Sequence, residues 1–269
     1  MMRNRIFLLL IPFFVLTVGI IYVLNNNALQ TITYFPIDQE NQFVEAKSEL
    51  ESSHQKDDSF YNITWTSNSK SNHDLYLRQD ASLLFDNGRL RGVRSKWEQD
   101  TASIQLKESL SGKDDSFFQV ITYHHGEVHY PDDTIKSIQH MSQDKLYVSE
   151  TANKKLDKTT KKQLLYHWNQ LFKHFNIDET SYTSVPLTHL YTYNQKAIPG
   201  MSQTETDQII GQLWEGLYKN YIIPAASTKK NAGSNYVPLI LFDKEHKHLL
   251  VLFELNGKKE KLIQQYPNL

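Results

Sequence analysis

The chain contains no cysteine, so disulfide bonds and a lipid-modified N-terminal cysteine are both excluded. Exported domains often use disulfides for stability, particularly when they are small. A cysteine-free exported domain depends on its hydrophobic core instead, and this is more typical of a bacterial cell envelope than of a eukaryotic secretory pathway.

An excess of positive charge and a glycine-rich loop are also lacking. The chain has 29 basic and 30 acidic side chains and a formal net charge of −1. This balance gives no reason to expect nucleic acid as a partner. No glycine-rich phosphate loop follows any predicted strand, so nucleotide binding has no support either.

The common catalytic motifs are absent or incomplete. Neither Gly-x-Ser-x-Gly nor His-Glu-x-x-His occurs. Two segments, 67–70 and 227–230, match Ser-x-x-Lys, but neither Ser-Asp-Asn nor Lys-Thr-Gly follows them. Without a complete catalytic set, the sequence favours a protein that is not an enzyme.

One long apolar run stands at the N-terminal end, over residues 6–24. It has no charged side chain, and as a helix it would span roughly 28 Å, about the thickness of a bilayer core. Arg3 and Arg5 precede it, and the next basic residue is Lys47, so the positive-inside rule predicts a cytoplasmic N-terminus and an exported C-terminal part. The alternative is a cleaved signal peptide, although its apolar region is usually shorter.

These features predict a division of the chain into four parts. They are a cytoplasmic tail (1–5), a transmembrane signal-anchor helix (6–24), a polar tether (25–58) and an extracytoplasmic domain (59–269) with an alternative subdivision near residue 150. A weak apolar stripe within the tether predicts a short stalk helix over residues 39–51.

The exported part is predicted to be an α+β domain, an antiparallel sheet with two amphipathic helices. Several short strands are expected over 60–149, with a hairpin at Asn87-Gly88, and a three-stranded meander at the C-terminal end. Apolar residues at helical spacing predict helices over 159–175 and 203–221, the second capped by Ser202 and Glu205 and ended by Pro224.

The sharpest candidate site is a histidine cluster. If the segment is extended, His125, Glu127 and His129 point to one face, since strand side chains alternate. Two imidazoles and a carboxylate are a typical zinc ligand set with one position open for water. The alternative is a turn at His125-Gly126, which would separate the three ligands. Zinc is therefore a conditional prediction, and no other cofactor is expected.

A second candidate is a basic face at the start of the first helix. Five lysines recur at helical spacing and could contact an anionic lipid or wall polymer: Lys154, Lys155, Lys158, Lys161 and Lys162. The aromatic residues Tyr182, Tyr191 and Tyr193, between the two predicted helices, would either complete the core or bind a sugar or a partner protein.

Taken together, the sequence predicts a single-pass membrane protein whose extracytoplasmic module binds or regulates an envelope protein or a wall polymer. Two alternatives remain open. One is a metal-dependent envelope hydrolase that uses His125, Glu127 and His129. The other is a membrane assembly factor that acts through its transmembrane helix.

Overall fold

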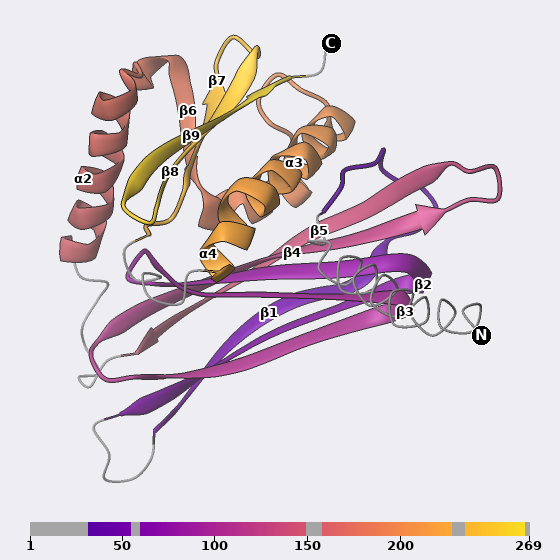
Figure 1. Ribbon diagram of the computed structural model, residues 1–269, viewed down its shortest axis with the longest axis horizontal. Helices are drawn as coiled ribbons and strands as arrows, with labels where there is room; N and C mark the ends of the chain where they lie inside the picture. The colour runs from indigo at the N-terminus through magenta and orange to yellow at the C-terminus, as the bar shows by residue number, and fades with distance from the viewer. Residues whose placement is uncertain (1–31, 55–59, 149–157, 228–234, 267–269) are drawn as a thin grey trace, which may run out of the picture. The chain divides into compact units, whose positions relative to one another are not determined.

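Five antiparallel strands form the first sheet of the protein, sheet A. The computed structural model describes residues 32–54, 60–148, 158–227 and 235–266. The strands of sheet A are β1 (Phe43–His54), β2 (Tyr61–Asp86), β3 (Arg89–Gly112), β4 (Ser116–His129) and β5 (Ile135–Val148). Their order is β1-β2-β4-β5, and β3 pairs with the other edge of β2 (Figure 1).

Sheet A curls into a half-barrel because its two longest strands bend. The pairing of β2 with β3 is interrupted between Lys70 and Leu75. Beyond this point the chain folds back, so that Trp65 on the first leg of β2 donates a hydrogen bond to Ser82 on the second leg, at 2.8 Å. The first leg of β2 pairs with β1 and the second with β4, and the half-barrel encloses the space between them.

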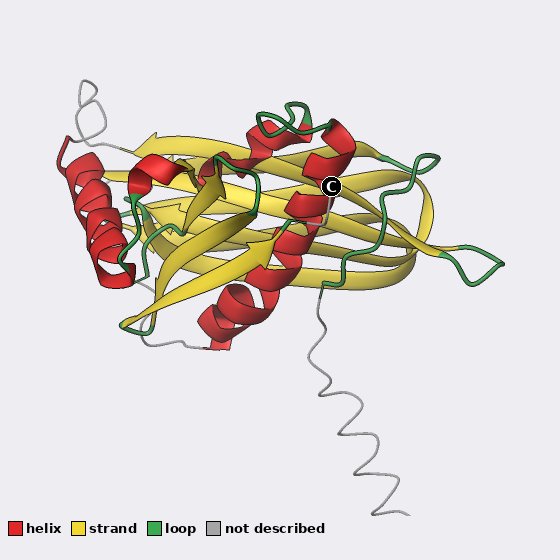
Figure 2. Cartoon of the chain, turned by 90° about the horizontal axis from the view of Figure 1, so that it is seen from above, coloured by secondary structure: helices red, strands yellow, loops and turns green. Residues whose placement is uncertain are grey.

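A second sheet, sheet B, and the helices lie on one side of sheet A (Figures 1 and 2). Sheet B has the order β6-β7-β8-β9. Its strands are β6 (Tyr182–Pro186), β7 (Leu239–Asp243), β8 (His248–Leu255) and β9 (Lys258–Gln265). The helices are α2 (Lys158–Phe175), α3 (Gln203–Leu217) and α4 (Ile223–Ser227), with shorter helical turns η1 (Glu179–Ser181), η2 (Leu187–Asn194) and η3 (Tyr218–Ile222).

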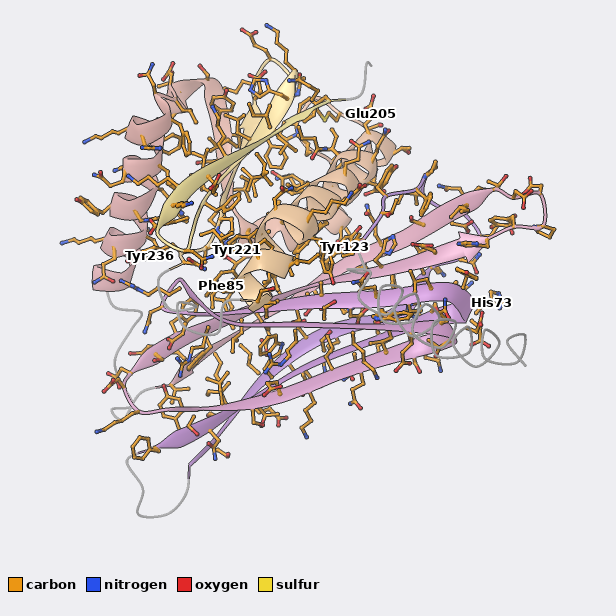
Figure 3. The ribbon with its side chains drawn as sticks, viewed as in Figure 1. His73, Phe85, Tyr123, Glu205, Tyr221 and Tyr236 are labelled. Carbon is orange, nitrogen blue, oxygen red and sulfur yellow. The ribbon has the colours of Figure 1, made fainter. Side chains whose placement is uncertain are left out.

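The largest core lies between the two sheets. Phe85 and Tyr123 of sheet A and Tyr221 of η3 meet in this layer, as Figure 3 shows. The outer face of sheet B is covered by α2, whose buried Leu171 packs among leucines of β7 and β8. A third apolar cluster, around Trp65 and Phe118, fills part of the half-barrel.

Several local predictions are confirmed. The hairpin between β2 and β3 turns at Asn87 and Gly88, whose φ angles of 50° and 75° are those of a two-residue turn. The first helix, predicted over 159–175, is α2. The capping box of Ser202 and Glu205 begins α3. The C-terminal meander is β7, β8 and β9.

Pro224 does not end the second helix, contrary to the prediction. The π-type turn η3 follows α3, and the Ile223 N–H bonds to the Tyr218 carbonyl five residues earlier. A wider turn relieves the contact between a proline ring and the carbonyl four residues before it. The chain therefore continues through Pro224 as α4.

The predicted fold class is wrong. The described structure is mostly antiparallel sheet, with a curled half-barrel and three α-helices rather than two. Within the described residues, no helix is both long enough and apolar enough to cross a membrane. The predicted transmembrane segment, 6–24, lies outside those residues.

The predicted stalk helix is also wrong, because residues 43–54 form strand β1. The apolar side chain of Leu50 is buried against β2, and its neighbours Glu49 and Glu51 face outwards. This alternation has a period of two, and pairing with the first leg of β2 satisfies the backbone of the segment. Part of the predicted tether therefore belongs to sheet A.

Candidate functional site

The half-barrel closes at a seam where β1 and β5 lie side by side without strand pairing. Side chains join the two edges instead. Ser48 on β1 and Ser142 on β5 are hydrogen-bonded at 2.7 Å, and the Leu50 N–H donates to Asp144 Oδ2 at 2.8 Å. The side-chain amide of Asn194 in η2 accepts from the Met141 N–H and donates to the Met141 carbonyl. It thereby satisfies two backbone groups at the edge of β5 that a neighbouring strand would otherwise pair with.

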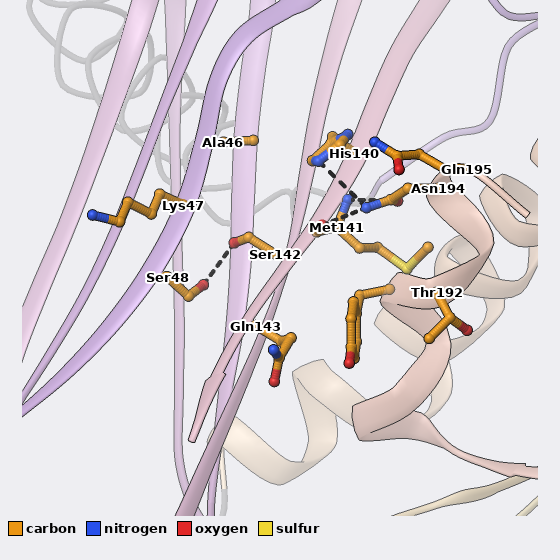
Figure 4. A pocket seen from close by; sticks show the side chains of 11 residues that line it. Ala46, Lys47, Ser48, His140, Met141, Ser142, Gln143, Thr192, Asn194 and Gln195 are labelled. Atoms are coloured by element: carbon orange, nitrogen blue, oxygen red, sulfur yellow. Dashed lines mark hydrogen bonds between the residues drawn. The ribbon is translucent and has the colours of Figure 1, made fainter. Parts of the chain in front are cut away.

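A groove of about 360 Å³ follows this seam (Figure 4). Strands β1 and β5 form its floor and one wall, and η2 forms the other wall. The lining residues are Ala46, Lys47, Ser48, His140, Met141, Ser142, Gln143, Tyr191, Thr192, Asn194 and Gln195. Hydroxyl and amide groups predominate, and no Asp or Glu is among these residues.

Beneath the groove, seven buried side chains form a continuous chain of hydrogen bonds, which we call the hydroxyl relay. Each of its links is 2.7 or 2.8 Å long. In order, its members are Trp65, Ser82, Thr122, Ser48, Ser142, His124 and Asp80. The relay thus connects β1, β2, β4 and β5 across the seam.

With a neutral His124, one direction for every bond in the relay satisfies both of its ends. The Trp65 indole N–H can only donate, and an ionised Asp80 carboxylate can only accept. The neutral His124 then donates from Nδ1 to Asp80 and accepts at Nε2 from Ser142. Ser142 in turn accepts from Ser48. Each hydroxyl passes on its one proton, so none is left over for another partner.

Asp80 lies in a fully buried polar cluster with Arg78. The Arg78 Nη2 is 4.0 Å from Asp80 Oδ1, and both side chains have no exposed surface. Ser69 links them, since it accepts from Arg78 at 2.5 Å and donates to Asp80 at 2.8 Å. Burial lowers the pKa of Arg78, while the charges of Asp80 and Glu98 act in the opposite direction. The ring of Phe43 lies over the guanidinium, 4.8 Å away.

Ser142, His124 and Asp80 have the spacing of a catalytic triad, but their burial argues for a different role. His124 has no exposed surface and both of its ring nitrogens are occupied. A general base must also return its proton to a leaving group in the substrate, and His124 can reach only Ser142. The relay therefore orients the Ser142 hydroxyl rather than activating it.

The predicted metal ligands share one face of β4. His125, Glu127 and His129 are extended, and Gly126 stands in mid-strand because a Cβ there would lie 2.4 Å from Leu75 Cδ1. His129 Nε2 is 3.3 Å from Glu127 Oε2, whereas buried His125 is hydrogen-bonded to Ser137. No metal-binding group of three such residues is found in the part of the chain that the structure describes. Zinc binding stays a prediction, and metal analysis of untagged protein would test it.

The predicted basic face is only partly described. Lys154 and Lys155 lie outside the described residues, and so does the side chain of Lys158. Lys161 and Lys162 are exposed on α2. Contact with an anionic lipid or polymer stays a prediction. Of the predicted aromatic residues, Tyr191 lines the groove, while Tyr193 is buried against Phe242.

Sequence reasoning missed the relay and the groove, because their residues come from separate strands and form no local motif. One signal was present. Ser67, Ser69 and Ser71 alternate along β2, and Asp80 and Ser82 do so on its second leg. Small polar residues on the inward face of a strand indicate a buried polar network.

No protein-family model, curated protein or solved structure matches the chain. The function must therefore be inferred from the chemistry of the groove itself.

Proposed function

We propose that the protein is a binding module of the cell envelope that holds a neutral, hydroxyl-rich chain, such as an oligosaccharide, in the groove between β1, β5 and η2. The observation that carries this proposal is the direction of the hydroxyl relay. With a neutral His124, Ser48 and Ser142 both donate their protons within the relay, so they present only lone pairs to a ligand.

The two serines in the floor select a ligand by chemistry, and the one lysine of the lining, Lys47, is already paired with Glu49. Sugar hydroxyls can donate to both serines. An ionised phosphate or carboxylate group has no proton to donate to the serine oxygens. These buried acceptors would then lack hydrogen-bond partners. The floor therefore favours a neutral polyol over an anion of similar size.

The walls of the groove suit the same ligand. Gln143 and Gln195 carry amides that donate and accept, and Thr192 adds a hydroxyl. The ring of Tyr191 offers a flat apolar surface on which a sugar ring can pack. Hydrolysis of a glycosidic bond ordinarily needs a pair of carboxyl groups, and the groove lining has none. Binding without turnover is the function that these side chains support.

The test compares two α-1,4-linked tetrasaccharides in which a neutral hydroxymethyl group on each sugar is replaced by a carboxylate. Galactotetraose is neutral, and tetragalacturonate carries a carboxylate on each sugar. Calorimetry with the purified full chain should show binding of the neutral tetramer and at least about tenfold weaker binding of the anionic one, because each unpaired buried acceptor costs about 1–3 kcal/mol. Equal affinities, or preference for the anion, would overturn the proposal.

Two substitutions locate the binding site. Ser142→Ala removes one acceptor and should weaken binding of the neutral tetramer about two- to tenfold. Ser184→Ala, which removes an exposed hydroxyl on β6, is the matched control and should leave the affinity unchanged. If both variants bind like the parent, the ligand does not occupy this groove.

The role of Ser142 has a separate test. A fluorophosphonate probe reacts with activated serines, and we expect no labelling of Ser142 because His124 is enclosed. Stoichiometric labelling that is lost in the Ser142→Ala variant would instead make Ser142 a nucleophile, and the protein an esterase.

A further inference from the structure

Strand β3 has a long open edge. It pairs with β2 along one side, and no strand among the described residues pairs with its other side. The middle of this edge, Ser95–Gln99, carries Trp97, an aromatic side chain that is 40% exposed. An open edge offers backbone donors and acceptors to another strand, and proteins usually cover such an edge or protect it with charges.

The charges on this edge follow a regular order. On one face of the sheet, Lys96 of β3 lies opposite Asp80 of β2, and Glu98 lies opposite Arg78. Lys96 and Glu98 also pair with each other at 2.5 Å, with side chains 43% and 38% exposed. At these two positions, therefore, each charge on β2 has an opposite charge beside it on β3.

We infer that a second copy of this chain adds to the open edge of β3, antiparallel to it, about a two-fold axis at Trp97. This arrangement places Lys96 opposite the partner's Glu98 and Glu98 opposite the partner's Lys96. Trp97 then lies beside the partner's Trp97. The alternation of charge that begins on β2 continues across β3 into the second copy, in which every directly opposed pair has opposite signs.

Neighbouring registers are disfavoured by the same charges. An axis at Lys96 would oppose two lysines, and an axis at Glu98 would oppose two glutamates. Like charges directly opposite each other destabilise a strand pair. On the C-terminal side, Asp100 has a left-handed backbone with φ of 49°, which ends the regular segment. The paired segment is therefore short, and the dimer forms reversibly.

Because the natural chain has no cysteine, disulfide crosslinking tests the register directly. Ser95 and the partner's Gln99 are opposed in this dimer. A mixture of full-length Ser95→Cys and Gln99→Cys chains should form a mixed disulfide dimer at least about tenfold faster than either variant alone. Gln105→Cys, an exposed position on the same strand, is the control and should not crosslink with either. Equal crosslinking in all combinations would overturn the inference.

Charge exchange tests the contact without cysteine. Lys96→Glu opposes glutamates, and Glu98→Lys opposes lysines, so each variant alone should self-associate about tenfold more weakly than the parent in sedimentation equilibrium. In a mixture of the two variants, the two negative side chains of one chain face the two positive side chains of the other. Mixing should therefore restore the dimer.

A parent chain that stays monomeric at all concentrations would refute the inference. So would a mixture that stays monomeric although circular dichroism shows both variants to be folded. The crosslinking result is independent of either charge variant and decides the question if one of them fails to fold.

Discussion

Removal of the Asp80 charge is the most informative perturbation of the half-barrel. Asp80→Asn keeps the shape of the side chain and can still accept from His124, but it removes the buried opposite charge of Arg78 and leaves Glu98, whose side chain is 38% exposed. The side chains of Asp80 and Arg78 have no exposed surface, so water cannot solvate the guanidinium in place of the carboxylate.

The expected loss can be estimated from burial. Breaking a buried ion pair by removing one partner costs about 3–5 kcal/mol, because the remaining charge stays desolvated. A domain of this kind has a free energy of unfolding of about 5–15 kcal/mol, so this loss is a large share of the total. The control is Glu245→Gln. Its pair with Lys247 is shorter, at 2.5 Å, but the side chains are 70% and 69% exposed, so the loss should be under about 1 kcal/mol.

Urea unfolding of Asp80→Asn, Arg78→Met and the double variant would measure these values. If the charge on Arg78 is the cause, the double variant should be less destabilised than the sum of the single variants by at least about 1 kcal/mol. The reasoning fails if Asp80→Asn costs no more than Glu245→Gln, or if the two single losses simply add.

Three further predictions concern pH, packing and capping. Burial lowers the pKa of His125 to about 4 in the folded state. The contribution of neutral His125 to the free energy of unfolding is therefore complete above the ordinary histidine pKa of 6.5, and it is lost as the pH falls from 6.5 towards 4. About 3 kcal/mol should disappear over that range, and a His125→Gln variant should show a shallower acid transition in pH-dependent urea unfolding. Gly92→Ala would bring a Cβ to 2.8 Å from Trp65 Cζ3, and thermal unfolding should show a loss of about 1–3 kcal/mol, since Trp65 is held by the relay. Ser202→Ala removes the cap of α3 and should cost about 1 kcal/mol in the same assay, while an unchanged midpoint would show that the capping box contributes nothing.

The features that the sequence predicted correctly depend on short-range interactions. The turn at Asn87-Gly88 needs two residues that tolerate positive φ, and both are adjacent in the chain. The start of α3 needs Ser202 and Glu205 three residues apart. The shared face of His125, Glu127 and His129 was conditional on an extended segment, and pairing with β2 and β5 excludes the alternative turn at His125-Gly126.

Only the tertiary structure decided the rest, because it depends on partners that are distant in the chain. Residues 43–54 form a strand since β2 supplies hydrogen bonds and a surface for Leu50, whereas an isolated segment of this sequence has a weak helical stripe. The relay unites residues from Ser48 to Ser142, and each of them reads as an ordinary polar residue on its own strand. Curling of sheet A excludes water from these groups, and with a neutral His124 their hydrogen bonds have one consistent direction. That direction makes the groove floor an acceptor, a property that no single segment of the sequence carries.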